Sequence, residues 1–244
     1  MILRRLAQSI RKQDWFVVAM EFVIVVAGIF VGLQVTEWNE QRQLREREVS
    51  YLIRLAEDVA VMRAEIDEIL GSAEGRTEAA MRAFRALERC DAGLAEPEDF
   101  RRALAFYQNQ RTAVLVERTY EEMLATGALA AMEDRDLSGE IAGAFSGLRN
   151  YKAFVDSVRV SLPVIDQVLW RNLDLSYDDE GIPMLRDFDF AAACQNRELR
   201  NAVWEIYDLF WDWEAGTKRA AEQIDQLDAR LDRHLAALGR GTAP

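Results

Sequence analysis

One apolar run near the N-terminus constrains this chain more than any other part of its sequence. From Trp15 to Thr36 the residues are almost all apolar, and Glu21 is the one acid among them. As a helix these residues would extend about 33 Å, close to the roughly 30 Å of a bilayer's hydrocarbon core. Trp15 and Trp38 flank the run, where amphipathic rings settle at membrane–water boundaries. The sequence therefore predicts a transmembrane helix over residues 15–37.

The flanking residues predict how this helix is oriented. Residues 1–14 carry four basic residues and one acid, and their apolar residues recur at helical spacing. We therefore expect a basic amphipathic tail in the cytoplasm, with its cations on lipid phosphates. Arg42, Arg45 and Arg47 follow the run and oppose this orientation. No small-residue cleavage site follows the run, which predicts an uncleaved signal anchor in the bacterial inner membrane. Residues 38–244 would then lie in the periplasm.

The composition of the remaining chain predicts an acidic, helical domain. The chain has 30 basic and 42 acidic residues, of which residues 1–36 hold four and two, so residues 37–244 carry a net charge of −14. Such a domain repels phosphate backbones, and we expect no nucleic-acid partner. Only four prolines and thirteen glycines interrupt sequences rich in good helix formers. The expected fold is all-α: the transmembrane helix continues into an extended antiparallel bundle of four to six helices.

Apolar periodicity and breaker residues place the helices of this domain. A heptad seam from Leu52 to Ile69 continues the first helix to a break at Gly71 and Gly75. Pro97 begins another helix at its first position, and Pro163 is expected to kink a long one. The last helix carries a seam that ends at Leu238. The expected helices cover 37–71, 76–90, a segment from 97, a segment from 119, 138–172 and 197–238, with 173–196 the least regular stretch.

One face of the predicted transmembrane helix carries small residues together with its acid. At 100° per residue, five positions fall within about 80° of one another. These positions are Glu21, Val25, Gly28, Gly32 and Val35. A GxxxG pair permits close helix approach, and a carboxyl group in lipid needs a partner. Three interpretations remain open: a self-association face, an ion-coupling site at Glu21, or a surface for another membrane protein. The expected partners are the lipid bilayer and a second copy or another membrane protein.

Three blocks of the sequence resemble a family of uncharacterised bacterial single-span membrane proteins, known as a domain of unknown function. The blocks are EFVIVVAGIFVGLQVTEWNE at 21–40, TYEEMLATGAL at 119–129 and the weaker NRELRN at 196–201. The resemblance implies a membrane-anchored helical protein and supplies no activity. In the second block, Thr119 is expected to cap the amide near Glu122, and Gly127 to form a left-handed turn. Tyr120, Met123 and Leu124 are expected to pack inward, and the alternative is a binding loop.

Five aromatic residues crowd the first half of the last helix, and two cysteines lie far apart. The aromatic residues are Trp204, Tyr207, Phe210, Trp211 and Trp213. Such a belt is either a thick core where helices meet or the lining of a ligand pocket. Cys90 and Cys194 have no CxxC spacing, so they are either two buried thiols or a disulfide, which requires an oxidising compartment.

The sequence contains few residues suited to catalysis or metal binding. His234 is its one histidine, which argues against a zinc site and a Ser-His-Asp triad. No P-loop, GxGxxG or HExxH signature is present, so we expect no enzyme, no metal and no cofactor. The predicted function is a membrane-anchored scaffold or assembly protein. The alternative is a periplasmic ligand-binding or sensing module that acts through a membrane partner.

Overall fold

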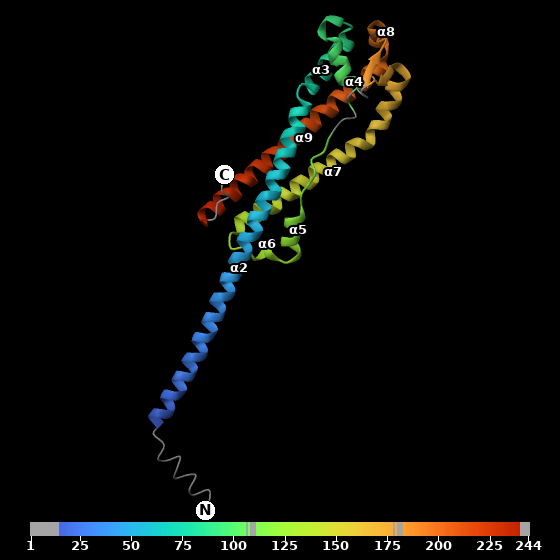
Figure 1. Cartoon of the computed structure of the whole chain (residues 1–244). Helices are drawn as coiled ribbons and strands as arrows, with labels where there is room; N and C mark the ends of the chain where they lie inside the picture. Colours follow the sequence, from blue (N-terminus) through green and yellow to red (C-terminus); the bar gives the residue numbers. More distant parts are fainter. Residues whose placement is uncertain (1–14, 106, 108–110, 178, 180–182, 240–244) are drawn as a thin grey trace, which may run out of the picture. The chain divides into compact units, whose positions relative to one another are not determined.

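The structure is a computed structural model that describes residues 15–105, 107, 111–177, 179 and 183–239 (Figure 1). The described part is predominantly α-helical, which confirms the all-α prediction in its coarse form. Two short strands are the exception. The predicted basic tail, residues 1–14, lies outside the described residues. The chain divides into two compact units, residues 1–50 and residues 51–244.

The elements follow one another in chain order with short connections. They are α2 (Trp15–Ala73), α3 (Arg76–Arg89), the 3-10 helix η1 (Ala92–Leu94), α4 (Pro97–Ala105), α5 (Arg118–Ala125), α6 (Ala128–Ala131), α7 (Arg135–Asn172), β1 (Asp174–Tyr177), β2 (Pro183–Arg186), α8 (Phe190–Gln195) and α9 (Arg197–Ala237). Within the second unit, α3, α4 and α8 gather at one end, and α5 and α6 at the other (Figure 1).

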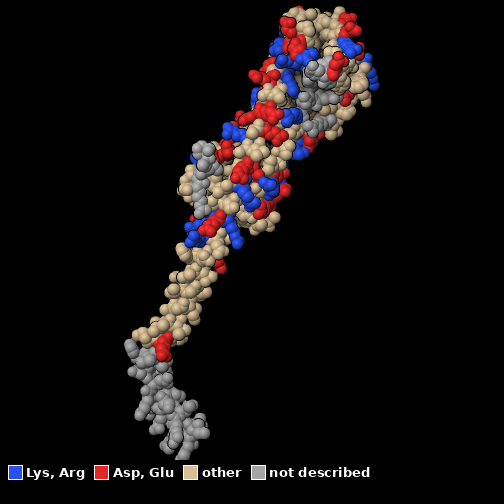
Figure 2. Space-filling view, viewed as in Figure 1, with Lys and Arg blue, Asp and Glu red and all other residues tan. Residues whose placement is uncertain are grey.

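The first unit consists, in its described residues, of the N-terminal part of α2. Every side chain described from 19 to 47 is exposed, including those of Phe22, Ile29 and Phe30. Figure 2 shows this stretch as a surface almost free of charge beyond Glu21. The helix is long and apolar enough to cross a membrane. Its exposed apolar side chains have no interior of their own to enter.

The second unit is organised around α7 and α9, which pack along each other, and the C-terminal part of α2. The seam predicted for α2 is buried from Leu52 to Ile69, as are Ile141, Phe145 and Leu148 on α7. The buried stripe of α9 agrees with prediction over most of its length. Its end differs, because Leu235 is buried whereas Leu238 is 47% exposed. The helix ends at Ala237, so the last turn lacks a neighbour for Leu238.

A second core lies at the end of this unit that holds α3 and α4. Leu87 of α3, Leu104 of α4, Leu169 of α7 and Ile206 of α9 are buried together there. Pro97 begins α4 as predicted, and Glu98 lies in its first turn, where the helix dipole favours an acid. This core joins segments that are more than a hundred residues apart in sequence.

Glycines and hairpin residues mark where the sequence-based boundaries succeed and fail. Gly75, at φ 75°, precedes α3, and Gly127, at φ 73°, precedes α6, both in the left-handed region. Gly71 does not break α2, which continues to Ala73. The stretch 173–196, expected to be irregular, holds an antiparallel hairpin in which Asp174 pairs with Arg186, followed by α8. Four-residue strands carry too little periodicity to be recognised in the sequence.

Candidate functional site

The predicted association face lies on the exposed part of α2. Glu21, Val25, Gly28, Gly32 and Val35 are all exposed within the chain. A Cβ atom added at Gly28 or Gly32 would meet nothing within 4 Å. The hydroxyl of Thr36 donates to the carbonyl of Gly32 at 3.0 Å, so it is satisfied within the helix. The face is therefore open to a second helix, and the backbone at both glycines is accessible to close approach.

The block at 119–129 forms α5 and the turn into α6, and it contacts α7 through Tyr120. The Tyr120 ring stacks on Phe145, with centroids 4.2 Å apart and planes 3° from parallel. The Arg149 guanidinium lies 5.4 Å above the Tyr120 ring and pairs with Glu117 and Glu121. The pKa of Arg149 is raised, chiefly by its hydrogen bond to Glu117. These contacts fix α5 against α7.

The same block contacts α2 through its acids and its first turn. Glu122 accepts hydrogen bonds from Arg54 at 2.8 Å and from the Tyr51 hydroxyl at 3.2 Å. The hydrogen bond from Arg54 holds the pKa of Glu122 below its usual range. The Thr119 backbone N–H donates to the buried carboxylate of Asp58 at 3.3 Å. Residues of α5 thus join α2 to α7.

Two details predicted for this block are wrong. Thr119 does not cap the helix: α5 begins at Arg118, and the capping residue Glu117 makes no side-chain cap. The side chain of Thr119 is fully buried, and its N–H is used by Asp58 on another helix. Leu124 is 48% exposed, whereas Tyr120 and Met123 are buried as expected. Tertiary contact with α2 therefore replaces the local capping box.

The aromatic belt of α9 divides between core and surface. Phe210 and Trp213 are buried, and the indole N–H of Trp213 donates to the Arg111 carbonyl at 3.2 Å. Trp204 and Trp211 are 46% and 57% exposed. Tyr207 is partly buried, and its ring centroid lies 6.4 Å from that of Trp211. The five side chains diverge around the helix and do not converge on one shared space.

Cys90 and Cys194 are joined by a disulfide, with Cα atoms 5.3 Å apart. Cys90 is the residue at which α3 ends, in the left-handed region at φ 52°, and Cys194 lies in α8. The bond closes 104 residues of sequence and ties α8 to α3. The sequence left the thiol and disulfide alternatives open, because spacing alone does not show that these two helices are neighbours.

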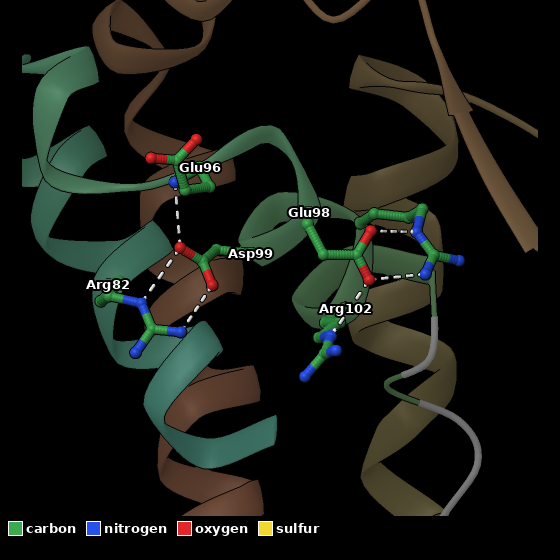
Figure 3. A network of polar contacts seen from close by, with 6 residues as sticks. Arg82, Glu96, Glu98, Asp99 and Arg102 are labelled. Atoms are coloured by element: carbon green, nitrogen blue, oxygen red, sulfur yellow. Dashed lines mark hydrogen bonds and ion pairs between the residues drawn. The ribbon is translucent and has the colours of Figure 1, made fainter. Parts of the chain in front are cut away.

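A buried carboxylate holds α3 and α4 together (Figure 3). Asp99 accepts hydrogen bonds from both Arg82 nitrogens, at 2.7 and 3.0 Å, and from the Glu96 backbone N–H at 2.9 Å. The hydrogen bond from Arg82 lowers the pKa of Asp99. Beside it, Glu98 accepts from Arg101 and Arg102, which lower its pKa to about 2. Sequence reasoning missed this network, because a spacing of seventeen residues carries no periodic signal.

The described residues also form a cavity and a shallow groove. The cavity, of about 310 Å³, lies between the β-hairpin, α8 and the adjoining ends of α7 and α9. The groove runs between α7 and α9 and is lined mainly by charged residues such as Glu140 and Arg233. His234 lies 3.5 Å from Asp134 near this groove. Among the described residues, no group of three or more His, Cys, Asp or Glu is arranged to hold a metal ion.

Comparison with protein-family models, curated proteins and solved structures found no match to this chain. The resemblance of its sequence blocks to a family of uncharacterised bacterial membrane proteins therefore stays a prediction.

Proposed function

We propose that the protein is a membrane-anchored helical scaffold of the bacterial inner membrane that assembles with a second copy through α2. The carrying observation is the exposure of every side chain described from 19 to 47. Apolar surface of this extent costs about 25 cal/mol for each Å² left in water, whereas lipid removes that cost. A helix with no polar face in its apolar stretch suits a bilayer.

The disulfide supports placing residues 38–244 in the periplasm. Disulfides persist in oxidising compartments and are rare in the cytosol. Cys90 and Cys194, the two cysteines of this chain, are bonded to each other. The test is labelling in intact cells with a membrane-impermeant maleimide, before and after an external reductant. Labelling that appears only after reduction supports this topology. Labelling that needs lysis and no reduction places the domain in the cytoplasm and contradicts it.

The small-residue face supports self-association in preference to a single anchored chain. Gly28 and Gly32 leave room for a second backbone, and Glu21 on the same face has no partner among the described residues. In a symmetric pair, two Glu21 carboxyl groups can share hydrogen bonds, which offsets the cost of placing them in lipid. Another membrane protein and an ion-coupling role for Glu21 are the competing explanations. No catalytic activity forms part of the proposal.

The decisive experiment compares two faces of the same helix. Gly28→Leu with Gly32→Leu fills the proposed contact, while Val26→Leu with Phe30→Leu changes the opposite face. We expect the first pair to convert oligomers to monomers and the second to leave them intact. Sedimentation equilibrium in detergent micelles measures the mass of each. Equal masses for all three proteins would contradict the scaffold. Loss of association only when a second protein is absent would indicate a different partner.

The sensing alternative has less support from the aromatic belt than the scaffold has from α2. Trp204 and Trp211 are exposed on one side of α9, while Phe210 and Trp213 lie in the core. A ligand pocket needs side chains that converge on one enclosed space. Quenching of tryptophan fluorescence by a metabolite would nevertheless favour that alternative.

A further inference from the structure

The cavity beside the β-hairpin has the size of a small-molecule site. Its volume of about 310 Å³ lies at the lower end of the range of roughly 300–1,000 Å³ typical of such sites. Part of its lining is apolar, from Leu173, Phe188 and Leu199. The remaining lining carries acids, arginines and amides, so the cavity offers one apolar region and several polar groups.

Four charged side chains at this cavity are unpaired within the described residues. Arg171, Arg186, Asp174 and Asp187 all line it, and the described residues provide none of them with a hydrogen bond or ion pair. Asp174 and Arg186 are even partners in the hairpin register. Elsewhere in the second unit arginines pair with acids, as in Arg54 with Glu122. Charges of both signs that stay apart at one cavity are available to a ligand that carries both signs.

Two amides in the cavity lining are held in place while keeping a free donor each. Asn196 accepts from the Leu199 N–H at 3.1 Å and donates to Asn172 at 2.6 Å. Asn172 in turn donates to the Val168 carbonyl at 2.7 Å. An amide nitrogen has two hydrogens, so each asparagine retains one donor. These donors are oriented before any ligand arrives, which lowers the entropic cost of binding.

The walls of the cavity are restrained on two sides. The disulfide at Cys194 ties α8 to α3, and Ala193 beside it lines the cavity. Asp187 has φ 44°, in the left-handed region. Non-glycine residues in this region cluster at functional sites, where the surrounding structure maintains them. The restraint and the unpaired charges therefore occur at the same place.

We infer that this cavity binds a small zwitterion of the amino-acid class with an apolar side chain. The ligand's carboxylate pairs with the guanidinium groups of Arg171 and Arg186, and its ammonium group pairs with Asp174 and Asp187. The apolar side chain lies against the apolar part of the lining. This site goes beyond the scaffold role and does not depend on association through α2.

The test is isothermal titration calorimetry of the full chain in detergent, with the disulfide intact. The probes are L-leucine, L-leucinamide, which lacks the carboxylate, and N-acetyl-L-leucine, which lacks the ammonium group. We expect saturable binding of L-leucine and about tenfold weaker binding of each derivative, since each loses one charge-assisted pair. No saturable heat with L-leucine up to about 10 mM overturns the proposal. Equal binding of either derivative overturns the zwitterion assignment.

Matched variants locate the site. Asp187→Asn keeps a residue that tolerates the left-handed region, and Arg186→Gln removes a cation from the other side. We expect each to weaken L-leucine binding about tenfold. Asp232→Asn and Arg85→Gln, at exposed positions outside the cavity, are controls that should bind normally. Normal binding by Asp187→Asn and Arg186→Gln, each folded by circular dichroism, overturns the location. Normal binding by the Gly28→Leu, Gly32→Leu protein separates this site from the scaffold.

Discussion

The two parts of α2 have the same backbone conformation and opposite surroundings. From 19 to 36, the side chains described in the structure are exposed on every side of the helix and nearly all apolar. From Tyr51 to Ala73, apolar residues are confined to one stripe, and that stripe is buried against the second unit. A helix that is apolar all round suits lipid, and one with a single apolar stripe suits a protein core. The distribution of apolar residues, not helicity, separates the two solvents.

Polar contacts differ between the two parts as well. The described ion pair of the first unit, Arg42 with Glu46, lies within one helix. In the second unit, Arg63 of α2 pairs with Asp225 of α9 at 2.8 Å, and other pairs join α2 to α5. Exposed pairs contribute only about 0–1 kcal/mol each, so they set neighbours more than stability. The second unit is held by contacts across sequence, and the first by local ones.

The largest effect is expected from arginine in the first part. Ile24→Arg with Ile29→Arg places two cations in the apolar stretch, at an insertion cost of about 5–7 kcal/mol for the pair. We expect the variant to leave the membrane fraction. Leu44→Arg, also exposed but beyond the stretch, serves as control and should stay membrane-bound. Carbonate extraction of membranes measures both. Retention of the double variant would show that this part of α2 is not the anchor.

Loss of the disulfide is expected to destabilise the second unit. Replacing Cys90 and Cys194 by serine removes a bond that closes a long loop, which typically costs about 2–5 kcal/mol of unfolding free energy. Urea unfolding followed by circular dichroism measures the change. The wild-type protein under reductant should match the double variant, and the variant itself should be insensitive to reductant. Identical midpoints with and without reductant in the wild type would argue that the thiols are free.

One leucine from each part of α2 tests the comparison directly. Leu52 is fully buried, whereas Leu44 is 58% exposed. We expect Leu52→Ala to lower the unfolding free energy by about 2–5 kcal/mol, because a cavity replaces packed methyl groups. Leu44→Ala should change it by less than about 0.5 kcal/mol. Equal losses in urea unfolding would mean that the two parts share one core.

A smaller effect is expected from the carboxylate between α3 and α4. Asp99→Asn sets an amide N–H against the Arg82 guanidinium and should cost about 1–3 kcal/mol. Because the pKa of Asp99 is lower in the folded state, its contribution is present at neutral pH and is lost as pH falls from about 4 through the folded-state pKa. The acid-induced loss of stability should therefore be smaller in the variant. Glu88→Gln, an exposed acid, is the control. An unchanged pH profile in Asp99→Asn would remove Asp99 from this role.

Sequence reasoning succeeded where the information is local. The seam beginning at Leu52, the start of α4 at Pro97 and the left-handed turn at Gly127 each depend on residues within a few turns of one another. It failed where a distant partner competes. The Thr119 amide binds Asp58 on another helix, and Leu124 faces away from the core because α5 is oriented by Arg54 and Arg149. Local patterns do not contain these partners.

By itself, the sequence determined the apolar stretch of α2, the helical class and most helix positions, because periodicity and apolar length are properties of consecutive residues. Only the tertiary structure decided that Cys90 meets Cys194, that Arg82 holds Asp99, and that the hairpin and α8 enclose a cavity with unpaired charges. Those arrangements join residues between 17 and 104 positions apart, and chain folding alone sets the distances between them.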